Sequence, residues 1–381
     1  MPRTMTLAAT LMLVFTCAFA DQFEVDELYA RVMKAQGPER AQLEAQLDKA
    51  CAQKDCRMTR LFWYTDLAEA ERVASQLGRP VISLHLLGRL DEELSCANSR
   101  FFRTTLYSDP AIAALLRDEF VLHWHSVRPV PRITIDFGDG RKIQQTITGN
   151  SAHYLLASNG VVLDALPGLH SPNAFREQLE RWVRLHQLLR QGDVAGVLAR
   201  YHADAFNEAT QHWRELSARS GVVIEKRKLT KTQIDSIALV ASRQAASKAR
   251  VERPMFAQLE FGQSLTTLQP TQWEKLGAME QDRVTFAPES IDVIRRKQFG
   301  DDAPHTEEMN TLMENLRRTV AAETIFNEIE LHRQIHSWFL NGEVEDLLSL
   351  NERIYDELFL TPSKDPWLGL RTPSVFTALN Q

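Results

Sequence analysis

The sequence has 381 residues, of which 44% are hydrophobic and 25% are charged, and its formal net charge is −6. This length allows two or three domains, and the composition is ordinary for a chain that folds around a buried core. The mildly acidic charge argues against a nucleic-acid partner, because proteins that bind nucleic acids present clustered lysine and arginine.

The first 20 residues have the pattern of a secretory signal peptide. Arg3 precedes an apolar run over residues 7–17, and the Ala-Phe-Ala that follows at 18–20 is typical of a cleavage site. The apolar run is shorter than the roughly 20 residues that a membrane span needs. We therefore expect a signal peptide over 1–20, an exported protein that is periplasmic or extracellular, and no transmembrane segment after cleavage.

Cleavage would leave three cysteines, Cys51, Cys56 and Cys96. Exported proteins meet an oxidising environment, and an odd number of cysteines leaves one thiol outside any pair. Cys51 and Cys56 are the natural pair because they are close in sequence; the alternative is that all three are reduced and partly buried. Residues 21–57 around them have apolar residues at three-to-four spacing, broken at Gly37-Pro38, which predicts a helical segment.

Residues 58–190 alternate predicted strands and helices, which indicates an α/β domain. The pattern predicts strands over 61–64, 81–87 and 120–127, and hairpins over 132–147 and 153–166. It also predicts helices over 66–76 and 172–189 and a helix that begins at Asp109-Pro110. From residue 191 to residue 381 the pattern is almost wholly helical, with helices over 194–215, 231–248, 271–279, 307–339 and 344–358. We therefore expect an all-α domain over 191–381. Its last residues form a tail rich in proline and tryptophan.

A series of short motifs runs through the α/β segment in a fixed order. They are Trp63, Asp66, Leu67, Ala70, Gly78-Arg79-Pro80-Val81, Cys96-Ala97-Asn98-Ser99, Ser108-Asp109-Pro110, Phe120-Val121, Gly149-Asn150-Ser151-Ala152, Asn159-Gly160 and Gly168. In this order they resemble the thioredoxin-like superfamily, particularly its exported members. The resemblance implies a mixed central sheet flanked by helices, with Cys96 and Ser99 as the catalytic candidates and Asn150 and Ser151 beside the substrate groove.

The chain departs from that family at two positions that matter for chemistry. Ser99 stands where the family has a second cysteine, and Ser151 stands where it has a proline. A helix N-terminus stabilises a thiolate at Cys96, but a single thiol that forms a mixed disulfide cannot release its product without another thiol. The sequence therefore favours an interaction or scaffold module with a degenerate site, whose partner would be another exported protein. The alternative is a monothiol disulfide oxidoreductase or isomerase that uses Cys96.

Two sets of histidines allow a further alternative, a metal-binding protein. His123 and His125 share one face of a predicted strand, and His153 lies on a strand that could be nearby. Glu328, His332 and His336 follow at intervals of four on one face of a predicted helix. Both sets are equally consistent with structural hydrogen bonding, so the sequence assigns no metal ligand. Motifs for nucleotide, serine-hydrolase or covalent haem chemistry do not occur, and no cofactor is expected.

Overall fold

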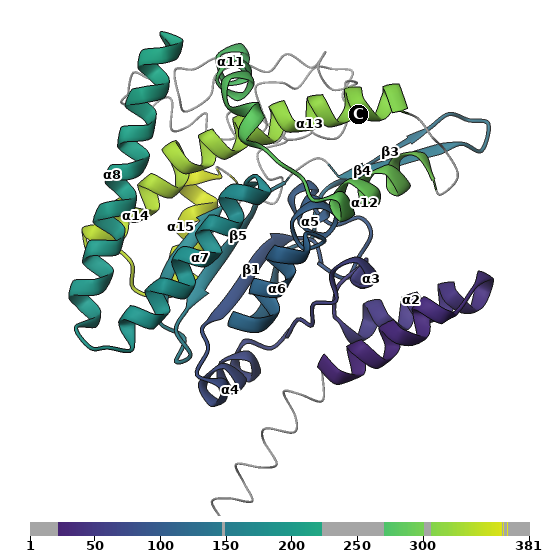
Figure 1. The fold of residues 1–381 in the computed structure, drawn as a ribbon, viewed down its shortest axis with the longest axis horizontal. Helices are drawn as coiled ribbons and strands as arrows, with labels where there is room; N and C mark the ends of the chain where they lie inside the picture. Colours follow the sequence, from purple (N-terminus) through teal and green to yellow (C-terminus); the bar gives the residue numbers. More distant parts are fainter. Residues whose placement is uncertain are drawn as a thin grey trace, which may run out of the picture.

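The computed structural model describes residues 22–146, 149–222, 270–300, 306–359, 361 and 364. The predicted signal peptide, the predicted helix over 231–248 and most of the proline- and tryptophan-rich tail lie outside these residues. The described chain is a mixed α/β N-terminal region followed by a mostly helical C-terminal region (Figure 1). No helix among the described residues is long and apolar enough to cross a membrane.

A four-stranded mixed sheet lies at the centre of the N-terminal region. Its strand order is β2-β1-β5-β6, in which β1 pairs parallel with β2 and antiparallel with β5, and β5 pairs antiparallel with β6. The strands are β1 (Val81–Leu87), β2 (Val121–Arg128), β5 (Ser151–Leu156) and β6 (Val162–Pro167). Every residue of β1 is buried, as expected for a central strand that is covered on both faces.

The strand expected over residues 61–64 does not form. It is reduced to one parallel bridge between Tyr64 and His123. On the side away from β2, the backbone N–H of Trp63 donates to the carbonyl of Cys51 (3.1 Å).

The predicted hairpin at 132–147 forms a separate two-stranded sheet, β3 (Arg132–Asp136) and β4 (Lys142–Thr146). It projects away from the central sheet and its helices (Figure 1). Gly138 and Gly140 both have positive φ, a conformation that glycine adopts without strain, and they turn the chain back on itself.

Six helices and one π-helical turn surround this sheet and precede the helical region. They are α2 (Gly37–Ala50), α3 (Cys56–Thr59), α4 (Leu67–Leu77), α5 (Ala97–Phe101), η1 (Phe102–Leu106), α6 (Pro110–Glu119) and α7 (Pro172–Leu189). The caps predicted from sequence are confirmed: Asp66 accepts the N–H of Glu69, Asp109 accepts the N–H of Ala111, and Gly78 ends α4 with a φ of 65°.

The C-terminal region packs its helices onto the same core as the sheet. Its elements are α8 (Val194–Ser220), α11 (Pro270–Glu280), η3 (Gln281–Arg283), α12 (Pro288–Phe299), α13 (Thr306–Phe326), η4 (Asn327–His332), α14 (Arg333–Leu340), α15 (Leu347–Arg353) and η5 (Ile354–Leu358). The helix expected over 307–339 is therefore interrupted by the π-helical η4. One hydrophobic cluster contains Leu84 and Trp182 of the α/β region together with Ile335 and Tyr355 of the helical region.

The N-terminal helices form a small cluster of their own. Residues 22–34 are helical and pack with α2 around Val25, Val32 and Leu47. Cys51 and Cys56, which belong to this cluster, are joined by a disulfide bond, and Cys96 is not part of a disulfide. The bond ties the end of α2 to the start of α3, just before the chain enters the sheet.

Replacing Cys51 and Cys56 together by alanine should lower the free energy of unfolding by about 2 kcal/mol, because the bond closes a short loop in the unfolded chain. Urea denaturation monitored by tryptophan fluorescence measures this change. Dithiothreitol should move the wild-type midpoint in the same direction and leave the midpoint of the double variant unchanged. A wild-type urea midpoint that does not change with dithiothreitol would contradict the predicted contribution of the disulfide bond to stability.

Candidate functional site

Cys96 lies between the end of β1 and the start of α5. It is the N-cap residue of α5 in an extended conformation, and its backbone N–H donates to the carbonyl of Leu87 (3.2 Å). The end of the central strand and the start of the helix therefore fix its position, as the sequence predicts. The side chain is completely buried, with no solvent-exposed area.

Ser99, one turn into α5, is also completely buried. Its hydroxyl donates to the hydroxyl of Ser95, so the single proton of Ser99 is directed at another serine and not at the Cys96 thiol. Ser95 also accepts a hydrogen bond from the guanidinium of Arg103 (3.2 Å). The two serines and the arginine form a polar group enclosed beside the cysteine.

The positive charge of Arg103 is already neutralised. Its side chain is fully buried and forms an ion pair with Asp55 (3.2 Å), whose carboxylate also binds Lys297 (2.8 Å). Arg100 donates to the hydroxyl of Thr146 at the end of β4 (3.0 Å). Both arginines that follow Cys96 in the sequence are thus held by partners of their own.

Asn150 and Ser151 lie at the opening of β5, against the first turn of α5. The amide of Asn98 donates to the hydroxyl of Ser151 (3.0 Å), which places this strand beside the helix that Cys96 caps. Neither residue borders an open groove. The amide of Asn150 donates to the hydroxyl of Thr361 (2.9 Å), and the hydroxyl of Tyr355 donates to the carbonyl of Asn150 (3.2 Å).

The histidines of β2 lie on the sheet face that α15 covers. The register pairs Ser83 with His123 and His85 with His125, so these four side chains share one face. Nδ1 of His123 is 2.7 Å from the hydroxyl of Ser83, which is 3.1 Å from Nε2 of His85. Nδ1 of His85 then lies 3.0 Å from the amide oxygen of Asn351 in α15.

Neutral imidazoles satisfy this chain of hydrogen bonds with one donor and one acceptor in each contact. The oxygen of Asn351 accepts from Nδ1 of His85, which leaves Nε2 of His85 to accept from the hydroxyl of Ser83, and Ser83 in turn accepts from His123. Burial and the neighbouring His125 and His123 lower the pKa of His85 to about 3, and burial and His125 lower the pKa of His123 to about 4. Sequence reasoning missed His85, although Ser83 and His85 alternate as the only polar residues of an apolar strand.

His153 is not brought together with His123 and His125. In the register it lies opposite Leu84, so it projects to the other face of the sheet. There its Nε2 is 2.6 Å from the hydroxyl of Tyr107, and its ring packs against Phe102. The three-histidine set considered from the sequence is therefore divided between the two faces by strand register.

His332 and His336 remain stacked, with ring centroids 4.1 Å apart, but Glu328 does not join them. The carboxylate of Glu328 lies 3.7 Å from Nδ1 of His212 on α8. The two histidines instead face Asp164 of β6, whose Oδ1 is 3.2 Å from Nε2 of His332 and 3.9 Å from Nδ1 of His336. Asp164 was not predicted, although a single aspartate within the apolar run over 161–167 is the feature that could have indicated it.

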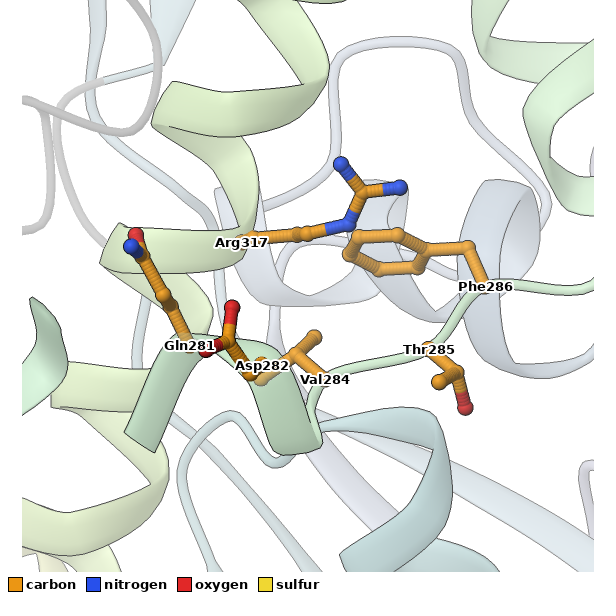
Figure 2. A pocket seen from close by; sticks show the side chains of 6 residues that line it. All are labelled: Gln281, Asp282, Val284, Thr285, Phe286 and Arg317. Atoms are coloured by element: carbon orange, nitrogen blue, oxygen red, sulfur yellow. The ribbon is translucent and has the colours of Figure 1, made fainter. Parts of the chain in front are cut away.

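Two surface pockets of the described residues lie away from Cys96. Figure 2 shows the first, which is lined by side chains from η3, from the chain that follows it and from α13, including Asp282, Phe286 and Arg317. The second lies between residue 22, the start of the α/β region and the ends of α4 and α6. Neither is lined by a site residue that the sequence predicts.

The neutral histidines on the α15 side make stability depend on pH in a defined direction. Because the folded-state pKa values of His85 and His123 lie below the unfolded value of about 6.5, unfolding takes up protons, and stability falls as pH drops from about 6.5 toward 4. His85→Gln should reduce this slope by about 1.4 kcal/mol per pH unit between pH 6 and 4. Urea denaturation of wild type and variant at a series of pH values measures the slope of stability against pH.

His125→Gln is the matched control, because the ring of His125 lies on the same face of the sheet but is exposed. This variant should reduce the slope of stability against pH less than His85→Gln does. Equal slopes for wild type and His85→Gln would contradict the neutral, buried state of His85.

Comparison with protein-family models, with curated proteins and with solved structures finds no match for this chain.

Proposed function

We propose that this chain is an exported, thioredoxin-like protein that serves as an interaction scaffold and whose active site is degenerate and covered. The order of elements supports the family resemblance. A buried strand, β1, leads to Cys96 at a helix start; Asp109 and Pro110 then open α6; β2 follows; and Ser151 begins β5 beside Asn98. These elements stand in the order of the family motifs.

The complete burial of Cys96 is the observation that carries the proposal. Thiol–disulfide exchange requires the sulfur to meet a substrate disulfide directly, so its rate depends on access as well as on thiolate content. Among the described residues Cys96 has no second thiol to act with, because Cys51 and Cys56 are bonded to each other. These cysteines therefore favour a structural role for the Cys96 segment over catalytic turnover.

The C-terminal chain occupies the position where the family resemblance implies a substrate groove. Tyr355 and Thr361 both bind Asn150, and the carbonyl of Thr361 accepts a hydrogen bond from Arg128 (3.4 Å). A substrate peptide would have to displace these contacts. We infer that the partner, another exported protein, is recognised elsewhere on the molecule, with the helical region as the specificity element.

The second candidate function, monothiol oxidoreductase or isomerase, is favoured by one feature. Cys96 caps α5, so backbone N–H groups of that helix lie close to its side chain. Such activity would require the C-terminal chain to move away from Asn150 and expose the sulfur. Accessibility of the thiol in the native protein therefore separates the two functions.

Iodoacetamide should label Cys96 of the native protein at least about 100-fold more slowly than an exposed thiol, because labelling then needs an opening that costs about 3 kcal/mol or more. The reference is the variant Cys96→Ser with Gln144→Cys, which places the only free thiol on the exposed face of β4. Mass spectrometry over a time course measures both rates.

Two results together would contradict the scaffold proposal. They are rapid labelling of the wild-type protein in native buffer and an exchange reaction with glutathione disulfide that the variant Cys96→Ser no longer performs. Slow labelling that accelerates in urea, together with no exchange, supports the scaffold proposal.

A further inference from the structure

We propose that Asp164, His332 and His336 bind a divalent metal ion of the zinc class. One ligand atom from each of these residues lies within 4.8 Å of the others, and all three residues are buried. His202 lies beside this group, because its Nδ1 is 2.8 Å from Nδ1 of His336. The site is separate from Cys96 and goes beyond the scaffold function proposed above.

The distances match a tetrahedral site. Zinc binds imidazole nitrogen and carboxylate oxygen at about 2.0–2.2 Å, which in a tetrahedron places neighbouring ligand atoms about 3.3 Å apart. Oδ1 of Asp164 is 3.2 Å from Nε2 of His332 and 3.9 Å from Nδ1 of His336.

The carboxylate is oriented by partners outside the site. Oδ2 of Asp164 accepts hydrogen bonds from the indole of Trp182 (2.8 Å), the hydroxyl of Tyr201 (2.5 Å) and the amide of Gln178 (3.2 Å). Oδ1 accepts the backbone N–H of Ala165 (2.8 Å) and faces the imidazoles. Metal-binding carboxylates are commonly held in this way, with one oxygen fixed by outer groups and the other directed at the ion.

The charge of Asp164 also argues for a cation. The side chain is completely buried, and no lysine or arginine among the described residues lies within ion-pair distance of it. A buried carboxylate without a fixed cationic partner is costly. A divalent ion bound between Oδ1 and the imidazoles of His332 and His336 would supply the positive charge, and imidazole nitrogen is a ligand that suits zinc.

Three protein ligands leave a fourth position on a tetrahedral ion, and in a buried site only a small ligand such as water could fill it. The three ligands come from β6 and from the end of η4 and α14. The ion would therefore join the central sheet to the C-terminal region. Its role would be to hold the two parts of the chain together.

Protein purified without a histidine tag should contain one zinc per chain by elemental analysis, or should take up one zinc or cobalt ion per chain after treatment with a chelator. Cobalt should give the intense visible absorption of a tetrahedral site. Competition with a chromophoric chelator measures the affinity. Tyr201→Phe, which removes only an outer hydroxyl, should weaken zinc binding by about 10–100-fold, and His332→Gln with His336→Gln should weaken it further.

His212→Gln, on α8 but outside the cluster, is the matched control and should bind zinc as wild type does. The proposal is overturned if wild type takes up no stoichiometric zinc or cobalt. It is also overturned if the double variant retains wild-type affinity. Wild type and Tyr201→Phe decide the matter even if the double variant does not fold.

Discussion

The structure depends on one constraint: polar side chains in and beside the central sheet are buried, and several of them find partners in the C-terminal region. Asn351 of α15 accepts from His85, Thr361 binds Asn150, and His332 contacts Asp164. A buried polar group without a partner costs about 1–3 kcal/mol, so the sheet is stable only when these contacts are made. The α/β region and the helical region therefore share one core and one set of hydrogen bonds.

The same constraint shapes the proposed function. The contacts that satisfy Asn150 also cover the start of β5, which lies beside α5, so the completion of the fold and the closure of the proposed degenerate site would be one event. In a working dithiol enzyme the equivalent edge has to stay open to a substrate. Here stability and catalysis would compete for the same surface, and the buried thiol is consistent with stability having prevailed.

Local sequence patterns were sufficient for the parts of the fold that local forces decide. They located β1, the caps formed by Asp66 and Asp109, and the position of Cys96 at the start of α5. Properties set by distant contacts could not be predicted in this way. The strand register places His153 on the face of the sheet opposite His123. Tertiary packing, which leaves no periodic pattern in the sequence, places Asp164 beside His332 and His336.

The long sequence separation of these contacts bears on how the chain acquires its structure during synthesis. A nascent chain that ends at residue 190 has all four strands of the sheet, but it lacks Asn351, Thr361 and His332. Contacts between such distant segments form late and slowly, since a large loop must close before they are gained. The sheet would therefore reach its final stability only after the C-terminal helices have been made. If the proposed export holds, this order of events would keep the chain unfolded while it crosses a membrane.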